Sequence, residues 1–526
     1  MNIFKKSGMW IGAASLLSLS LVLFAAGCNS DQFLEEFPQG TFAFTEPRSS
    51  EDLETIIEGA YYTMGGNGGF RGILNWPILF TAFSSDEGWL PDEFINVGDE
   101  GRQWYSRDYS NRTFNWIERH WQAAYATIQS ANLVIDFLEG DPANGFNDRN
   151  GPDWTPRILG EAYFLRAFSN FQLAKSFGPP PNTSPDAPSI VLRSATPSGG
   201  FDNPGLASVS EVYDLIVSDV NRAIELLPEE FVESRDPNAY QDRVNKWGAH
   251  FLAAEVYFLM NDFAMAEQNA TAVIESGYFN LQDEVIDAWD DNSLGAQAPE
   301  VIWQYVTYNG NQQRWKPPIV HRIIGFTDAN GNPDRTNNGQ QLALSDVLVE
   351  NLGWDDPAVA ALDKRHNELY VRIEAGTDPR PNLDQISTLR IWPNKWYRAE
   401  FTGWGSASTA SLPLMRLPEM YLTRAAIRMT NGDNAGAAAD LNMVKQRAWA
   451  GDPSDFEPVT AAEVNMDMIA LERMIELAFE EDRIYFLQAL QQDIPPGERI
   501  ATDPFPFAQV RMPIPQGEAD VNPNIE

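Results

Sequence analysis

The sequence is poor in the residues that support most redox, metal and nucleophilic chemistry. It has one cysteine and four histidines in 526 residues, and the histidines His120, His250, His321 and His366 are far apart. A single cysteine excludes a disulfide within the chain, and neither an HExxH zinc motif nor a GxSxG nucleophile elbow occurs. The sequence therefore offers no recognisable metal centre and no recognisable nucleophile, and it predicts no cofactor.

Basic residues are also scarce. There are 37 Lys and Arg against 74 Asp and Glu, which gives a formal net charge of −37. A field of this sign repels phosphate backbones, so it excludes nucleic acid as a partner. It equally disfavours docking by charge on an anionic lipid surface. Solubility in a salty medium explains the acidity better than a specific cationic ligand does.

The first 28 residues are typical of a targeting segment. Lys5 and Lys6 precede an apolar run from Met9 to Ala26, and Cys28, the only cysteine, follows directly after Gly27. The segment Ala-Ala-Gly-Cys resembles a bacterial lipobox, with alanine at the place where leucine is usual. We therefore predict a signal peptide over 1–27, lipidation of Cys28, and a lipid-anchored tether over 28–45 that leads into a single domain over 46–526. A buried thiol or an uncleaved membrane anchor are the alternatives.

The rest of the chain is organised around the stretch from Arg157 to Phe177. Its apolar residues repeat at helical spacing and cover most of the helix surface, which predicts a helix with neighbours on nearly all sides. Gly178 and the three prolines after it mark where this helix ends.

Other helical patterns surround this central stretch. Two tight helix hairpins are expected, one around Asn261-Asp262 and one around Asn431-Gly432-Asp433, with small residues where the helices cross. We predict an all-α, tetratricopeptide-like hairpin scaffold with a long loop-rich ligand-binding region that contains little β-structure. The expected scaffold covers 46–64, 116–277 and 413–490; the aromatic loop regions cover 65–115 and 278–412, with one buried strand at 300–308; and an extended tail covers 491–526.

Nine ordered segments together resemble the SusD/RagB nutrient-uptake lipoproteins of the Bacteroidetes outer membrane. They are the lipobox at Cys28, FLEEFP at Phe33, WQAAYATIQSANLVID at Trp121, EAYFLRAFSNFQLAKSFGPPP at Glu161, YFLMNDFAMAEQNATAVIESGYFNL at Tyr257, PLMRLPEMYLTRAA at Pro413, NGDNAGAAADLNMVKQRA at Asn431, LERMIELAFEEDRIYFLQ at Leu471 and RMPIPQGEADVNPN at Arg511. The resemblance implies a surface-exposed, non-enzymatic binder of oligosaccharides, or in some members of peptides or other nutrients. It also implies a SusC-like TonB-dependent transporter as partner.

The aromatic loops lie outside these matching segments, so the ligand does not follow from the resemblance. Flat aromatic rings stack on the C–H faces of sugars, and rigid Trp and Tyr side chains in polar loops suit this role. We expect glycan-stacking residues among Trp89, Trp104, Tyr105, Trp315 and Trp354. The alternative is that such residues pin the loops onto the helices, as we expect of Trp303 in its apolar strand.

Two alternative chemistries remain open. Adjacent carboxylates could serve as the acid and base of a helical glycoside hydrolase, although pairs arise readily by chance among 74 acids. The available pairs are Asp86-Glu87, Asp92-Glu93, Asp290-Asp291 and Asp355-Asp356. The turn-rich segment from Asp328 to Asp334 superficially resembles a calcium loop but departs from the EF-hand pattern at Pro333 and Gly339. A purely structural surface protein is the third hypothesis.

Overall fold

The computed structural model describes residues 47–65, 72–74, 76–90, 99–140, 154–196, 203–231, 243–289, 298–305, 308–309, 312–313, 326–327, 333–334, 342–373, 389–393, 395, 412–499, 503–506 and 510–525. Residues Ser49–Glu526 form one compact unit. The predicted signal peptide, Cys28 and the tether lie outside the described residues, as do Trp315 and most of the segment 328–334.

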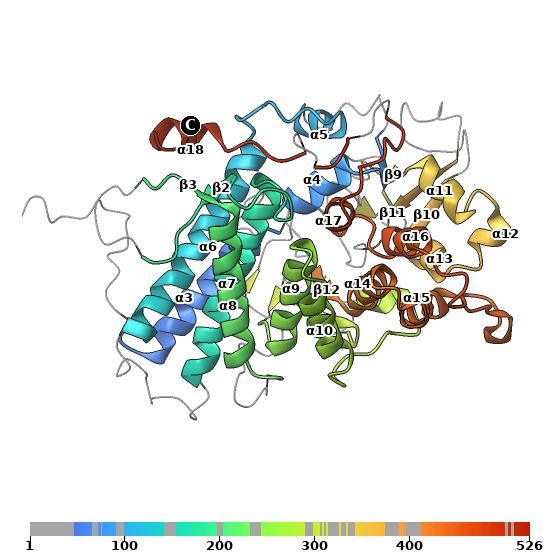
Figure 1. The fold of residues 1–526 in the computed structure, drawn as a ribbon, viewed down its shortest axis with the longest axis horizontal. Coiled ribbons are helices and arrows are strands. Elements are labelled where there is room, and N and C mark those ends of the chain that lie inside the picture. The colour runs from blue at the N-terminus through green and yellow to red at the C-terminus, as the bar shows by residue number, and fades with distance from the viewer. Residues whose placement is uncertain are drawn as a thin grey trace, which may run out of the picture. The chain divides into compact units, whose positions relative to one another are not determined.

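Helices build most of this unit (Figure 1). They are α3 (Ser50–Gly65), α4 (Trp76–Ser84), α5 (Asp99–Tyr105), α6 (Asn115–Gly140), α7 (Trp154–Phe177), α8 (Val209–Leu226), α9 (Lys246–Leu259), α10 (Phe263–Ile274), α11 (Asp346–Leu352), α12 (Pro357–Ala360), α13 (Lys364–Leu369), α14 (Leu417–Thr430), α15 (Asn434–Ala448), α16 (Met466–Glu476), α17 (Arg483–Ala489) and α18 (Gln516–Val521), with 3₁₀ turns at Val285–Trp289 and Pro453–Asp455. The all-α prediction is confirmed.

Helix α7 occupies the centre of the scaffold, as its pattern predicts. It packs along α6 and α8 (Figure 1), and every residue from Arg157 to Gly178 is buried. Its charged side chains are paired with distant residues. Arg166 forms a bidentate pair with Asp219 of α8 at 2.7 Å, and Lys175 lies 2.9 Å from Glu481. These pairs offset the large cost of burying a charge.

The two predicted hairpins are present, and their turns have the same construction. Asp262 accepts the Met265 N–H at 3.2 Å and so caps α10, and Asp433 accepts the Gly436 N–H at 2.9 Å and caps α15. Each turn includes a residue with positive φ, Asn261 at 63° and Gly432 at 81°. The tetratricopeptide-like prediction for these units is confirmed.

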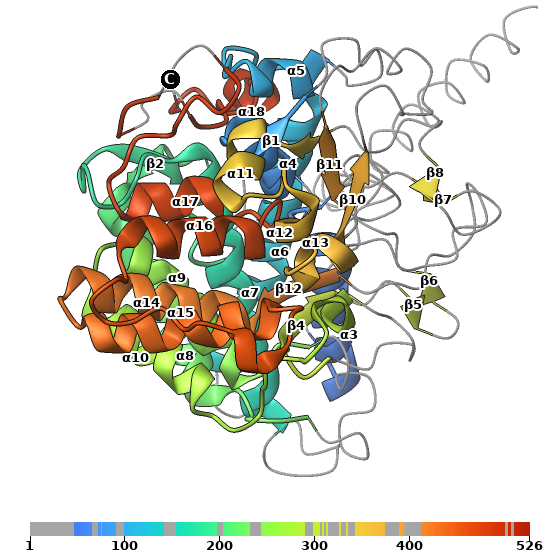
Figure 2. The ribbon, with the colours of Figure 1, turned by 90° about the vertical axis from the view of Figure 1, so that its right-hand side faces the viewer.

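The strands that the structure describes are short, and each pairs with one other strand. They are β1 (Gly88–Trp89), β2 (Pro188–Val191), β3 (Leu206–Ser208), β4 (Val301–Tyr305), β5 (Tyr308–Asn309), β6 (Gln312–Gln313), β7 (Phe326–Thr327), β8 (Pro333–Asp334), β9 (Ala343–Leu344), β10 (Tyr370–Ile373), β11 (Arg390–Pro393) and β12 (Leu412–Arg416). The antiparallel pairs are β1–β9, β2–β3, β4–β12, β5–β6, β7–β8 and β10–β11. Figure 2 shows β1, β10 and β11 on one flank of the helices.

Several boundaries differ from the prediction. The region 278–412, expected as loops, contains α11, α12 and α13, and the tail 491–526, expected as extended, contains α18. The expected loop region 65–115 contains α4 and α5; all nine residues of α4 are buried, so it has no polar face that would reveal a helical period. Residues 413–416, expected to open a helix, belong to β12 because this strand pairs with β4. The helix expected over 462–490 is broken into α16 and α17 by Phe479 and Glu481, whose φ angles are positive.

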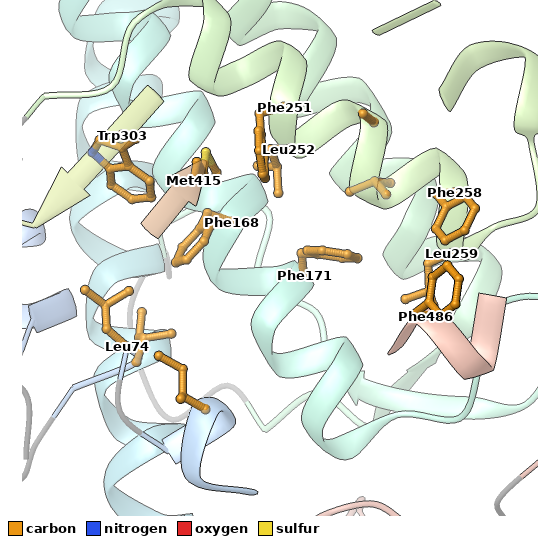
Figure 3. Packing of buried hydrophobic residues seen from close by; sticks show 14 of the residues in the cluster. Leu74, Phe168, Phe171, Phe251, Leu252, Phe258, Leu259, Trp303, Met415 and Phe486 are labelled. Atoms are coloured by element: carbon orange, nitrogen blue, oxygen red, sulfur yellow. The ribbon is translucent and has the colours of Figure 1, made fainter. Parts of the chain in front are cut away.

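The apolar core extends through most of the helices and includes the place where α7 meets the second half of the chain. Figure 3 shows Phe168 and Phe171 of α7 beside side chains from α9, β4, β12 and α17. The edge of the Trp303 ring contacts Phe168, with ring centroids 5.4 Å apart. Trp303 is 2% exposed, which confirms the expectation that it belongs to the core.

A buried ionic network joins the C-terminal helices to the strands. Glu476 of α16 accepts from Arg447 at 2.6 Å, from Arg416 at 3.0 Å and from Arg365 at 3.3 Å. Burial alone would raise the pKa of Glu476, but these guanidinium groups hold it well below its usual range. Because the partners come from α13, β12 and α15, this one carboxylate fixes the relative positions of three elements.

Candidate functional site

Two of the predicted stacking residues are buried and take the structural role instead. Trp104 is 0% exposed and lies against Phe80 and Trp116, with ring centroids 5.3 and 5.4 Å away. Trp354 is 2% exposed and packs against His366 and Tyr370. A ring without an exposed face cannot stack on a ligand, so the stacking prediction is wrong for these two side chains.

Trp89 is the predicted residue whose surroundings suit recognition. It is partly exposed at the end of β1, which pairs with β9. The guanidinium carbon of Arg390 lies 3.6 Å from the centroid of its ring, and the ring of Trp392 lies steeply inclined to it, with the two ring centroids 6.4 Å apart. The cation and the second indole hold the Trp89 ring in one orientation, so it is pre-organised for stacking.

Tyr105 lies in the same environment. It is partly exposed, and the guanidinium carbon of Arg499 is 4.0 Å from its ring centroid. Burial raises the pKa of its hydroxyl, and the charges of Arg499, Glu498 and Arg390 also act on it. Since Arg390 covers Trp89, the two predicted aromatics belong to one group, which we call the Trp89 cluster: Trp89, Tyr105, Arg390, Glu498 and Arg499.

No local pattern in the sequence indicates the charged members of the Trp89 cluster. Arg390 is paired with Asp346 and lies 3.6 Å from Glu498, and Glu498 also accepts the Asp346 N–H at 2.7 Å. Arg499 donates to the backbone oxygens of Phe83, Ser85 and Tyr105. These contacts join segments about 400 positions apart in the chain, which no local pattern can reveal.

The carboxylate pair Asp86-Glu87 anchors the loop that carries Trp89. Asp86 forms a bidentate pair with Arg483, both distances being 2.8 Å, and Glu87 accepts the Phe479 N–H at 3.2 Å. Ser345 donates its hydroxyl to the Asp86 carbonyl at 2.8 Å. The side chains are 7% and 1% exposed, so a substrate cannot reach them without rearrangement. This geometry favours an anchoring role over an acid and base pair.

The other acidic pairs give the hydrolase alternative no further support. Asp356 caps α12 by accepting the Ala358 N–H at 2.8 Å, and Asp355 beside it is exposed. The pairs 92–93 and 290–291 lie outside the described residues. Among the residues that the structure describes, no group of three potential metal-binding side chains occurs.

Glu87 makes stability depend on pH in a direction that can be tested. Burial, reinforced by Asp86, raises its pKa from 4.5 to about 8. The folded state therefore holds a proton that the unfolded state releases, and the free energy of unfolding falls by up to about 1.4 kcal/mol per pH unit as pH rises through this interval. We expect Glu87→Gln, which keeps an acceptor for Phe479, to lose less stability between pH 5.5 and 8.5 in denaturant titrations.

The matched control is Glu225→Gln on the exposed surface of α8, where the carboxylate is 65% exposed. Its curve is expected to run parallel to that of the unaltered protein. A parallel curve for Glu87→Gln as well would contradict the assignment of a proton to Glu87.

A cavity in the centre of the scaffold is a poor candidate for ligand capture. It is bordered by Lys175, Glu255, Glu419 and Arg473, and has a volume of about 80 Å³. This volume corresponds to roughly two or three water molecules. A sugar ring does not fit in a cavity of this size.

The chain matches known proteins over most of its length. Residues 84–258 match the family model described as "Starch-binding associating with outer membrane", and residues 332–487 match the model described as "SusD family". SusD-like protein P2 of Formosa agariphila is 26% identical over 509 residues, which cover 90% of this chain and 89% of the relative.

Solved structures agree in fold. A SusD superfamily protein from Bacteroides thetaiotaomicron superimposes with a TM-score of 0.71 at 21% identity, over 91% of this chain and 99% of the other. Surface glycan-binding protein A from Bacteroides uniformis superimposes with a TM-score of 0.70 at 18% identity, over 91% and 99% of the two chains. The chain thus shares its helical fold with these two proteins. Together with the sequence matches, this fold supports a SusD/RagB family protein.

Within the described part of the chain, no helix combines the length and the hydropathy needed to cross a bilayer.

Proposed function

We propose that the protein captures an oligosaccharide on the surface that carries the Trp89 cluster and that it has no catalytic activity of its own. The observation that carries this proposal is the partly exposed Trp89 ring, held at 3.6 Å by Arg390 beside Tyr105. An oriented indole provides the flat apolar face that a pyranose ring needs, and the neighbouring charged groups provide partners for its hydroxyls.

The names of the matching proteins support a carbohydrate ligand. One matching family model is described as starch-binding, and similar structures include a surface glycan-binding protein from Bacteroides uniformis and a putative sugar binding protein from Bacteroides vulgatus. The last is 21% identical, with a TM-score of 0.71. The proposal extends this ligand class to the present chain.

We further propose that the captured glycan passes to a SusC-like TonB-dependent transporter in the outer membrane. A lipid on Cys28 would hold the protein at the outer surface, in line with the outer-membrane association in the family description. A binding protein that passes its ligand to a transporter must release the ligand intact. We therefore expect the protein to retain glycan without cleaving it.

The test is electrophoresis of the purified protein through gels that contain single polysaccharides, with a reducing-sugar assay on the same mixtures. We expect at least one polysaccharide to slow the protein while no sugar is released. Released sugar would overturn the binding function and support the hydrolase alternative. Free passage through every polysaccharide gel would contradict glycan capture, and peptides would then be the ligands to test.

A further inference from the structure

A second groove has the features of a binding site. Part of its lining comes from residues 107–112, which follow α5 in the chain, whereas Trp89 precedes α5. The groove lies between the loop after α5, the end of α7 with β2, and the C-terminal tail, and its volume is about 680 Å³. This is within the usual range for small-molecule sites, roughly 300 to 1,000 Å³. Three arginines line it, Arg107, Arg112 and Arg511, so we call it the arginine groove.

Backbone hydrogen bonds fix the walls of the arginine groove. The Met512 N–H donates to the Ser176 carbonyl at 2.7 Å, and the Gln516 N–H donates to the Arg112 carbonyl at 3.0 Å. The Nε–H of Arg112 donates to the Ile514 carbonyl at 2.9 Å. The C-terminal tail is thus hydrogen-bonded both to the end of α7 and to the loop after α5. A ligand would therefore meet a preformed surface rather than one that must be ordered on binding.

Two of the three guanidinium groups are available to a ligand. Arg107 is engaged, since it pairs with Asp503 at 2.8 Å and donates to two backbone carbonyls. Arg112 uses only its Nε–H, and Arg511 is exposed; within the described ranges neither has a carboxylate partner. Such cations are unexpected in a chain with twice as many acids as bases.

The carboxylate that lines the arginine groove is occupied locally. Oδ1 of Asp108 accepts both the N–H of Ser110, at 3.0 Å, and its hydroxyl, at 2.7 Å. These hydrogen bonds lower the pKa of Asp108, so it remains an anion with its charge partly satisfied. The lining therefore contains two available cations against one engaged anion.

Two of the residues that line this region have a buried polar atom without a partner in the described part of the chain. Ser189 is one of the lining residues of the arginine groove and is only 2% exposed, and its hydroxyl has no hydrogen-bond partner among the described residues. A second cavity of about 240 Å³ shares Pro179, Ala187 and Arg511 with the groove. Gln488, which lines this second cavity, is 7% exposed, and its Oε1 also has no hydrogen-bond partner among the described residues. Buried polar groups are normally hydrogen-bonded. A rearrangement of these two side chains would be needed for them to reach a ligand, which would then supply the partner that each lacks.

We propose that the arginine groove binds an acidic oligosaccharide. An anionic substituent of the sugar, either a carboxylate or a sulfate ester, would bind Arg112 and Arg511. Hydroxyl groups of the sugar would form hydrogen bonds with Ser189 and Gln488. Guanidinium groups bind such planar or tetrahedral anions through paired N–H donors. The position of Arg511 at the junction of the two cavities suits a ligand that extends over more than one sugar. This inference rests on the proposed glycan-binding function, which it refines by ligand charge.

The test is a calorimetric titration of the purified protein with a uronic-acid oligosaccharide, with a sulfated oligosaccharide, and with the methyl ester of the first. We expect at least one of the two acidic ligands to bind, and the uncharged methyl ester not to occupy the groove. Arg511→Gln is expected to weaken acidic binding by about tenfold or more. Because Arg511 is exposed, this variant should fold normally. Arg222→Gln, which removes an exposed arginine of α8, is the matched control and should change nothing.

The outcomes separate this inference from the proposed function. A neutral glycan retained while neither acidic ligand binds would overturn the arginine groove and leave capture at Trp89 standing. Acidic binding that is lost in Trp89→Ala but kept in Arg511→Gln would also overturn it, because the anion would then lie in the Trp89 cluster. Failure of both neutral and acidic ligands would overturn both.

Discussion

Replacing Glu476 by alanine is expected to lower the free energy of unfolding by about 3 to 5 kcal/mol, the usual cost of removing one partner from a buried ion pair. Glu476 is 1% exposed and lies within 3.3 Å of three guanidinium groups. Its removal leaves Arg365, Arg416 and Arg447 with reduced compensation in a region that water does not reach. Denaturant unfolding followed by circular dichroism measures the loss.

Glu225→Ala serves as the control for this experiment. Its carboxylate pairs with Arg222 at 2.7 Å but is 65% exposed, so we expect a change below about 1 kcal/mol. If the Glu476 variant does not fold, Glu476→Gln retains the shape and is expected to lie between the other two. Equal stability of the Glu476 and Glu225 variants would contradict a structural role for the network.

Replacing Trp89 by alanine is expected to weaken binding of a retained oligosaccharide by about tenfold or more, since aromatic anchors often contribute roughly 2 kcal/mol to recognition. The ring supplies the stacking surface, and its loss also leaves Arg390 without its aromatic neighbour. Trp89→Phe should retain part of the affinity, because a smaller flat face remains. Calorimetric titration of each variant gives the comparison.

Trp449→Ala is the matched control for Trp89. Trp449 is also a partly exposed tryptophan, but it lies at the end of α15, where its ring N–H donates to the Asp452 carbonyl at 3.0 Å. We expect unchanged affinity for this variant. A similar loss in both variants would indicate a general effect of removing tryptophan rather than a contact with the ligand.

The scaffold could be predicted from the sequence because its signals are local. The apolar surface of α7 and the Asx turns of the two hairpins each depend on residues within a few positions of one another. The break between α16 and α17 could not be predicted, because it depends on distant partners. Positive φ angles at Phe479 and Glu481 direct three successive acids towards different cations, Glu480 to Arg416, Glu481 to Lys175 and Asp482 to Arg473.

In the candidate site, too, local features could be predicted from the sequence and features that depend on distant residues could not. The sequence identified Trp89 and Tyr105 by residue type, but it treated Trp104 in the same way although that ring is buried. What separates Trp104 from Trp89 is the position of Phe80 and Trp116, which belong to other helices. The residues that orient Trp89 were also missed, since Arg390 is about 300 positions away from it along the chain. Residue type indicates candidates for binding, and tertiary packing decides which remain accessible.

The most direct test of the central claim is a crystal structure of the protein soaked with an oligosaccharide that the gels retain. The account predicts an intact sugar whose ring lies parallel to the indole of Trp89, with hydroxyl groups near the charged members of the Trp89 cluster. A sugar bound elsewhere that leaves Trp89 uncovered, in the arginine groove or on any other surface, would contradict it.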